Sequence, residues 1–131
     1  MTEIQSSKQY DLEERTGKFA KRCREFEKQL PRTAANIEDG RQLIKSSGSV
    51  AANYIEANEA LSRKDFFYRI KICRKEAKES RLWLRLVDTS NNQNIETERR
   101  ALIQEATELM KIFGSIIEKE KKEKQENLSK K

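Results

Sequence analysis

The sequence predicts an all-α protein that folds as an antiparallel up-and-down four-helix bundle. Helix breakers are rare, with one proline and four glycines among 131 residues, and residues that favour helices abound. Alternating runs of β-branched and aromatic residues, which are typical of strands, are absent. Apolar residues instead recur every three or four positions, as they do on one face of a helix. A chain of this length is expected to form one domain with a sizeable core.

The first predicted helix runs from about Asp11 to Leu30, because the following Pro31 cannot continue it. Residues 1–10 precede this helix and are expected to be flexible. The apolar positions of the helix recur at helical spacing and are therefore expected to face the core. These positions are Leu12, Phe19, Cys23, Phe26 and Leu30.

The second predicted helix begins near Thr33 or Ala34 and ends near Leu61. Steps of 100° per residue around Ala51 give its expected inward face. That face holds Ile37, Leu43, Ile44, Ser47, Val50, Ala51, Tyr54, Ile55, Asn58 and Leu61. The opposite face carries small and polar residues in place of long charged ones: Ser46, Ser49, Asn53, Glu56 and Ala60. We expect this face to pack against other helices of the bundle or against a second subunit; otherwise these are indifferent surface positions.

Ser62 is the expected N-cap of the third helix, with Asp65 three residues later. This helix has the most regular period in the chain, and its inward positions are Phe66, Ile70, Cys73, Ala77, Ser80, Leu84 and Val87. A polar loop follows, and the fourth helix starts near Ile95. Its inward positions are Leu102, Ala106, Leu109, Phe113 and Ile116. Residues 11–118 thus form the predicted bundle, and the charged tail 119–131 is expected to fray into disorder.

Several apolar residues lie away from these inward positions. They are Ile72, Trp83 and Leu86 on the third helix, and Ile103, Met110 and Ile117 on the fourth. If exposed, they would form unusually large apolar patches, so we expect subunit contacts at Ile72, Trp83 and Leu86 together with Ser46, Ser49, Asn53 and Glu56. A wide core face is the alternative.

The net positive charge is confined to the predicted third helix. Residues 63–86 hold nine basic and three acidic side chains, whereas the rest of the chain holds equal numbers of each. The face of this helix opposite its inward positions, here called the basic stripe, consists of Lys64, Tyr68, Lys71, Lys75, Lys78, Leu82 and Arg85. Cations in such a row suit phosphate contacts, which position a nucleic acid without reading its bases. The predicted nucleic-acid-binding residues are therefore Lys64, Lys71, Lys75, Lys78 and Arg85.

Two alternatives remain for the charges of this helix. The basic stripe is also compatible with a solvated lysine face, which helices display often. Three arginines lie nearer the edges of the inward face, Arg69, Arg74 and Arg81, and are candidates to pair with Glu56, Glu59 or Glu76 across helix or subunit boundaries.

Enzyme chemistry finds little support in the residues. The chain has no histidine, and SSGSV lies inside a helix without the Lys-Ser/Thr that a phosphate-binding loop requires. Cys23 and Cys73 lack further metal ligands and are expected in the core. We expect a non-enzymatic protein without metal or cofactor. No segment resembles a transmembrane helix or a signal peptide, so we expect a soluble, cytoplasmic protein with no membrane partner.

The run RQLIKSSGSVAANYIEANEALSRKDFFYRIKICRKEAKESRLWLRL, residues 41–86, resembles a family of small bacterial four-helix-bundle proteins. Members are encoded by intervening sequences of 23S ribosomal RNA genes, and a related branch is the accessory protein of diversity-generating retroelements. Asn53 and Glu56 match the polar pair of the family's Asn-Ile-Ala-Glu-Gly motif, whereas Ala57 replaces its glycine. The resemblance implies a homo-oligomeric barrel, with a pentamer favoured. For the retroelement branch it also implies contact with nucleic acid and a reverse transcriptase.

Two functions are therefore expected as alternatives. The first is a homo-oligomeric bundle that binds nucleic acid, RNA above all, through the basic stripe and without base specificity. The second is a protein-binding scaffold or assembly module in which the apolar and small residues carry the function and the lysines keep the assembly soluble.

Overall fold

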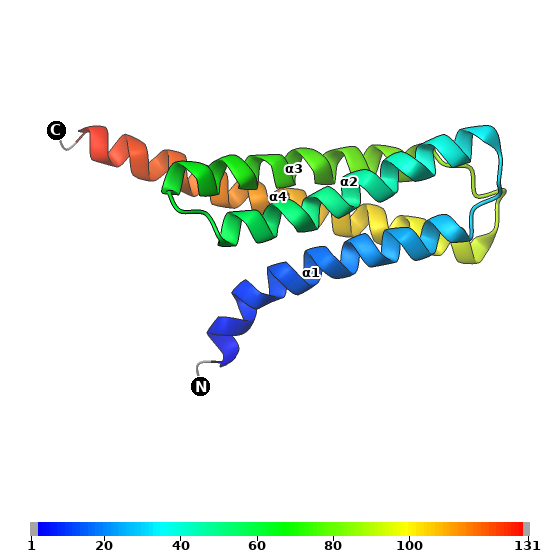
Figure 1. Cartoon of the computed structure of the whole chain (residues 1–131), viewed down its shortest axis with the longest axis horizontal. Helices are drawn as coiled ribbons and strands as arrows, with labels where there is room; N and C mark the ends of the chain where they lie inside the picture. Colours follow the sequence, from blue (N-terminus) through cyan, green and yellow to red (C-terminus); the bar gives the residue numbers. More distant parts are fainter. Residues whose placement is uncertain (1–2, 130–131) are drawn as a thin grey trace.

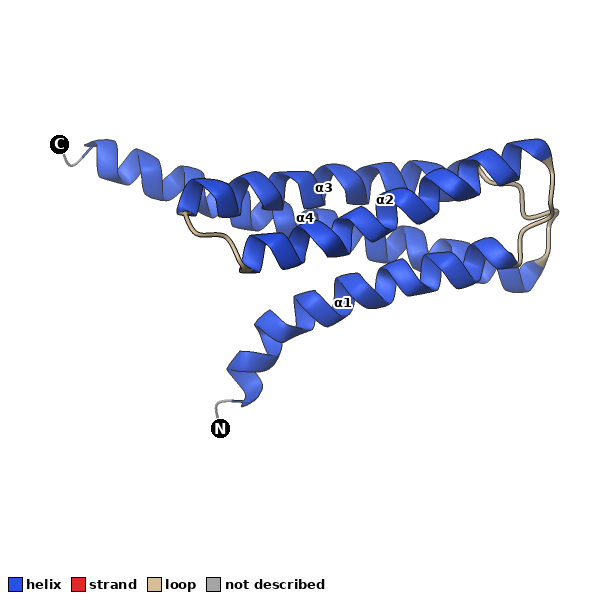
Figure 2. Cartoon of the chain, in the orientation of Figure 1, coloured by secondary structure: helices blue, strands red, loops and turns tan. Residues whose placement is uncertain are grey.

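The computed structural model describes residues 3–129, with side chains from residue 12 onwards. Within these residues the chain forms four α-helices and no strand (Figure 2). The helices are α1 (Glu3–Lys28), α2 (Ala34–Asn58), α3 (Arg63–Leu86) and α4 (Gln93–Ser129). The predicted all-α class is confirmed for this part of the chain.

The helices lie side by side, and the chain turns back at each short connection (Figure 1). Each helix contacts its neighbours in sequence, and α4 also contacts α1. The contact between α2 and α3 is the most extensive and that between α1 and α4 the least. The N-terminal part of α1 diverges from the other helices, and the C-terminal end of α4 extends past the connection between α2 and α3 (Figure 1).

The buried face of α1 agrees with the expectation. Phe19, Cys23, Phe26 and Leu30 are buried, and Leu12 packs partly against the core. The helix begins earlier than the expected start near Asp11. Residues 3–10 are helical in backbone, and residues 1–2 lie outside the described part. The predicted flexibility of this segment stays a prediction.

The buried face of α2 differs from the expectation. Its seam follows strict steps of four and three residues: Asn36, Gly40, Leu43, Ser47, Val50, Tyr54 and Ala57. Ile37 and Ile55 are about half exposed and Leu61 is fully exposed, so their prediction as core residues is wrong. Asn58 is exposed as well. The prediction assigned apolar residues to the buried face. The buried face of α2 instead begins with Asn36 and Gly40, which an apolar pattern does not detect.

The seams of α3 and α4 are largely as expected. Ile70, Cys73, Ala77, Ser80, Leu84 and Val87 are all buried, and Phe66 is partly buried. On α4 the predicted seam holds through Phe113 and then moves from Ile116 to Ile117, which is 1% exposed. An α-helix has 3.6 residues per turn, so a seam in steps of four and three drifts and needs an extra step of four. Ile117 is thus a core residue and is unavailable to a second subunit.

Two hydroxyl side chains cap the N-termini of α2 and α3. Thr33 Oγ1 accepts a hydrogen bond from the backbone N–H of Asn36 at 3.1 Å, and Ser62 Oγ accepts one from that of Asp65 at 3.0 Å. Such caps satisfy backbone donors that the first turn leaves free. The predicted N-cap at Ser62 is confirmed.

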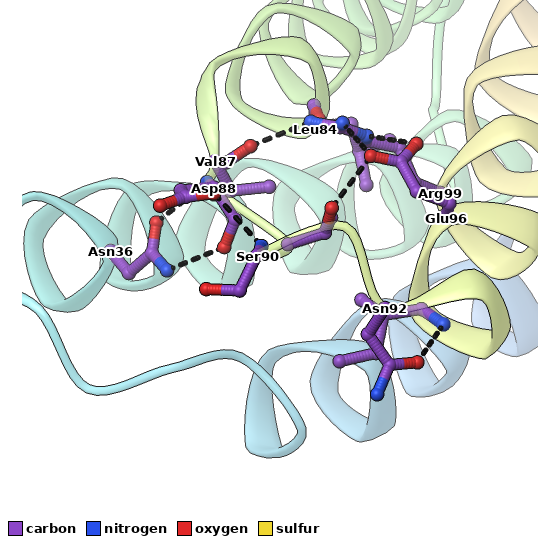
Figure 3. A network of polar contacts seen from close by, with 10 residues as sticks. Asn36, Leu84, Val87, Asp88, Ser90, Asn92, Glu96 and Arg99 are labelled. Carbon is purple, nitrogen blue, oxygen red and sulfur yellow. Dashed lines mark hydrogen bonds and ion pairs between the residues drawn. The ribbon is translucent and has the colours of Figure 1, made fainter.

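Asn36 joins the two connections at one end of the molecule (Figure 3). Its Nδ2 donates to the carbonyl oxygens of Pro31 at 3.0 Å and Asp88 at 2.8 Å. Its Oδ1 accepts from the backbone N–H of Asp88 at 2.9 Å. The side chain is buried and both of its polar atoms are hydrogen-bonded, so it joins the turn after α1 to the turn after α3.

A second polar group closes the end of α3 (Figure 3). Arg99 donates to the carbonyl oxygen of Val87 at 2.6 Å and pairs with Glu96. Thr89 Oγ1 donates to the same carboxylate at 2.6 Å. These bonds lower the pKa of Glu96, because both donors favour its ionised form.

The charged tail is helical as far as the structure describes it. α4 continues to Ser129, whereas the sequence predicted fraying from residue 119. Ion pairs one turn apart support the helix, Glu118 with Lys121 and Glu120 with Lys124. Arg63 of α3 pairs with Glu123, so the first turns of the extension remain attached to the bundle.

None of the four described helices has an apolar stretch sufficient to traverse a lipid bilayer.

The hydrogen bonds of Asn36 to the two connections, here called the Asn36 clamp, predict a large loss of stability when this side chain is shortened to alanine. Asn36→Ala removes three hydrogen bonds of a buried side chain to the backbone of Pro31 and Asp88, so we expect the free energy of unfolding to fall by about 2–4 kcal/mol in urea denaturation. Asn58→Ala is the matched control on the same helix, because Asn58 is exposed and its amide donates to the exposed Glu13 at 3.3 Å. We expect it to change stability by less than about 0.5 kcal/mol. Equal losses in both variants would contradict the clamp.

Two glycines are expected to respond to alanine with opposite signs. A Cβ at Gly17 meets no atom within 4 Å, so Gly17→Ala should stabilise by about 0.5–1 kcal/mol through helix propensity. A Cβ at Gly40 would lie 2.8 Å from Glu27 Cγ, in the middle of a side chain that pairs with Arg32. We expect Gly40→Ala to destabilise by about 1 kcal/mol. Thermal unfolding of both variants measures the difference, and a gain in both would refute the close approach of α1 and α2 at Gly40.

Candidate nucleic-acid interface

The basic stripe lies on the exposed side of α3. The buried seam of this helix fixes its rotation, and all seven residues of the stripe are exposed. The orientation that the sequence predicted is therefore confirmed. Whether these side chains bind anything is a separate question that their surroundings address.

Most of the stripe borders one groove of about 760 Å³ on α3, with one wall from α4. We call it the basic groove. Its lining residues are Lys71, Arg74, Lys75, Lys78, Glu79, Arg81, Leu82, Arg85 and Met110. Six of them are cationic and one is acidic. The groove unites four of the five predicted binding residues and adds Arg74, Arg81 and Met110.

The three added residues carried a partial signal in the sequence. Arg74 and Arg81 belong to the basic segment but were expected at the edges of the inward face, and Met110 was recognised only as an apolar residue away from the seam. Met110 reaches the groove through the packing of α3 against α4, where Arg81 Nη1 also donates to Thr107 Oγ1 at 3.1 Å. Sequence spacing within one helix does not show such a contact.

The six cations of the basic groove form no ion pair among the residues that the structure describes. By contrast, the arginines that lie between α1 and α4 form ion pairs with glutamates. Arg15 bonds Glu105 at 2.7 and 2.9 Å and Glu108 at 2.7 Å, and Arg22 bonds Glu98. The hydrogen bond from Gln104 and, second in size, the hydrogen bond from Arg15 lower the pKa of Glu108. The charge of the groove is therefore not offset by ion pairs within the described residues.

The alternative pairing of the edge arginines is not seen. Within residues 12–129, Arg69, Arg74 and Arg81 form no ion pair with Glu56, Glu59 or Glu76. Arg69 instead donates to Asn53 Oδ1 at 3.1 Å, between α3 and α2.

Lys64 is separated from the other predicted binding residues. It borders a second hollow, of about 540 Å³, beside the connection between α2 and α3. This hollow also contains Glu56, Glu59 and Asp65, so its charge is not cationic overall. We therefore leave Lys64 out of the candidate interface.

The small residues of α2 pack mainly within the chain. Ser46 is 3% exposed, and its hydroxyl lies 2.8 Å from that of Ser80 on α3. Its prediction as a subunit contact is wrong, because α3 covers this side of α2. Asn53 donates to the backbone and side-chain oxygens of Ser49 at 2.9 and 3.0 Å, and both residues are half-buried.

The remaining predicted subunit contacts differ in exposure. Glu56 and Leu86 are exposed, whereas Ile72 and Trp83 are partly buried, and Trp83 packs against the core. The indole N–H of Trp83 is buried without a hydrogen-bond partner among the described residues. Ile103 and Met110 also pack partly against the core, as the wide-core alternative expects.

The two thiols are core residues, as predicted. Cys23 and Cys73 are free and buried, and burial raises the pKa of each thiol to about 12. Both groups are therefore protonated at neutral pH and poorly suited to nucleophilic chemistry. No cluster of three or more His, Cys, Asp or Glu residues gathers within the described part of the chain.

Comparisons with known proteins place this arrangement in a family. The family model for the 23S rRNA-intervening sequence protein matches residues 8–115. A similar solved structure is the crystal structure of a protein of unknown function, from the S23 ribosomal protein family of Bacteroides thetaiotaomicron. It is 29% identical, with a TM-score of 0.70, and the match covers 81% of this chain and 97% of that one. No curated protein matches. The chain belongs to the 23S rRNA-intervening sequence protein family.

Proposed function

We propose that this chain is a non-enzymatic, cytoplasmic protein that binds nucleic acid, RNA above all, through the basic groove and without base specificity. The observation that supports this proposal is the set of six cations that border one groove and form no ion pair within the described residues. An interface of unpaired cations attracts phosphates by charge, whatever the base sequence.

The length of the groove sets the number of phosphates that it can contact. Lys71 and Arg85 are fourteen positions apart on α3, which corresponds to about 21 Å along the helix. Phosphates of one strand of a duplex recur about every 3.4 Å along its axis but wind around it, so about six is an upper limit for such a row. The six cations of the groove are sufficient for that number of phosphate contacts.

We further propose that the four helices form an antiparallel up-and-down bundle, and that copies of it associate into a homo-oligomeric barrel, with a pentamer favoured by the family resemblance. Of the predicted contacts, Ser49, Asn53, Glu56, Ile72, Trp83 and Leu86 remain candidates. A reverse transcriptase or another protein is a further proposed partner.

A protein-binding scaffold is the second candidate function. It is favoured by the exposed apolar side chains of Ile37 and Ile55 on α2 and of Leu86 at the end of α3. In this alternative the cations of the groove only keep the assembly soluble.

Salt and charge reversal separate the two functions. A labelled structured RNA titrated by fluorescence anisotropy should lose roughly tenfold to several hundredfold in affinity between about 50 and 200 mM salt, as three to six phosphate contacts imply. The triple variant Lys71→Glu, Lys75→Glu, Lys78→Glu should abolish binding at either salt concentration.

The matched control reverses Lys18, Lys21 and Lys28 instead. These exposed lysines belong to α1, which does not contact α3, and the change in net charge is the same. We expect the control to retain most of the affinity. Binding that survives in the groove variant, or is lost equally in both variants, would refute the basic groove as the interface.

The proposed assembly predicts a change of mass on substitution of Leu86. Leu86→Glu places a charge on an exposed leucine of the proposed interface, so light scattering should report a fall from the oligomeric to the monomeric mass. Leu128→Glu is the control, because Leu128 is also an exposed leucine but lies at the end of α4. A wild-type protein of monomeric mass would end the proposal of a barrel.

A further inference from the structure

The basic groove contains two apolar side chains among its cations. Leu82 lies between Lys78 and Arg85 on the outward face of α3 and is 46% exposed. Met110 of α4 lines the same groove and packs partly against the core. Phosphate contacts require neither residue, since phosphates need only cations and hydrogen-bond donors.

The form of the groove also exceeds what phosphate contacts need. A row of lysines on a convex helix surface suffices to follow a phosphate backbone. Here the cations border a concavity of about 760 Å³, a volume within the range of sites that enclose small organic ligands, about 300–1,000 Å³. A ligand that fills it has an anionic part at the rim and an apolar part at Leu82 and Met110.

An unpaired nucleotide has this combination of groups. Its phosphates are anionic, and its base has a flat face that is free to pack against side chains. In a duplex the same face is stacked between neighbouring bases, so Leu82 and Met110 would remain without a contact. An inorganic anion would likewise leave both side chains exposed to water.

We infer that the basic groove binds single-stranded RNA, with phosphates at the cationic rim and one base packed against Leu82 and Met110. This inference rests on the proposed function and specifies which form of nucleic acid the groove takes. The contact is to the face of the base and not to its hydrogen-bonding edges, so it discriminates strandedness and not sequence.

Three RNA ligands that share a ribose-phosphate backbone test the inference by fluorescence anisotropy. They are an oligouridine of about 20 nucleotides, an abasic RNA of the same length, and the oligouridine paired with oligoadenosine. With the wild-type protein we expect the oligouridine to bind on the order of fivefold more tightly than the abasic RNA. We also expect it to bind more tightly than the duplex.

Leu82→Ser should remove this preference for bases. Leu82 is an exposed residue and makes no part of the core, so the variant is expected to fold. Its affinity for oligouridine should fall to that for the abasic RNA, while its affinity for the abasic RNA and its salt dependence stay as in the wild type. Leu61→Ser is the matched control, because Leu61 is a fully exposed leucine outside the groove, and it should change neither affinity.

The outcomes separate this inference from the proposed function. Equal binding of oligouridine and abasic RNA, tighter binding of the duplex, or a base preference that persists in Leu82→Ser would overturn the inference and leave an RNA-binding groove in place. No binding of any of the three ligands at low salt would overturn the proposed function itself.

Discussion

The close packing of α2 against α3 is the constraint on which the rest of the structure depends. Ser46 and Ser80 meet through their hydroxyls at 2.8 Å, and the Cys73 thiol donates to the Val50 carbonyl oxygen at 3.5 Å. Such small side chains let the two helices approach closely and commit one face of α3 to the core. Since one residue corresponds to 100° of rotation, this commitment also fixes which side chains face outward. The cations of α3 face solvent because any other rotation would bury them.

Charged residues contribute differently at the two sides of α4. Toward α1, where helix contact is least extensive, Arg15 and Arg22 pair with glutamates of α4. Toward α3, Glu123 pairs with Arg63 near the end of the bundle, whereas beside the groove Arg81 bonds the neutral hydroxyl of Thr107. Among the described residues, α4 thus supplies carboxylates to the arginines of α1 and none to the cations of the groove. This asymmetry of α4, as much as the basic composition of α3, keeps the groove cationic.

Sequence periodicity predicted what depends on apolar spacing and missed what depends on polar contacts. The seams of α1 and α3 and the Ser62 cap follow from local patterns, and the structure confirms them. The face of α2 does not, because Asn36 and Gly40 occupy seam positions for reasons that lie in other segments: the Asp88 turn and the Glu27 side chain. Only part of the basic groove was predicted from the sequence. Its row on α3 is local, whereas its α4 wall is a tertiary contact.

The charges of the basic-groove cations are not balanced within the described part of the bundle, and this bears on the function of these side chains. They make no ion pair within the described residues, so their mutual repulsion is not offset by carboxylates of the bundle. A surface that serves solubility alone usually intersperses both signs of charge, as the tail of α4 does with its Glu–Lys pairs. Six cations with one glutamate around a concavity that also exposes Leu82 depart from that pattern in charge, in shape and in polarity. An anionic ligand with an apolar part accounts for all three departures, whereas solubility accounts only for the presence of charge.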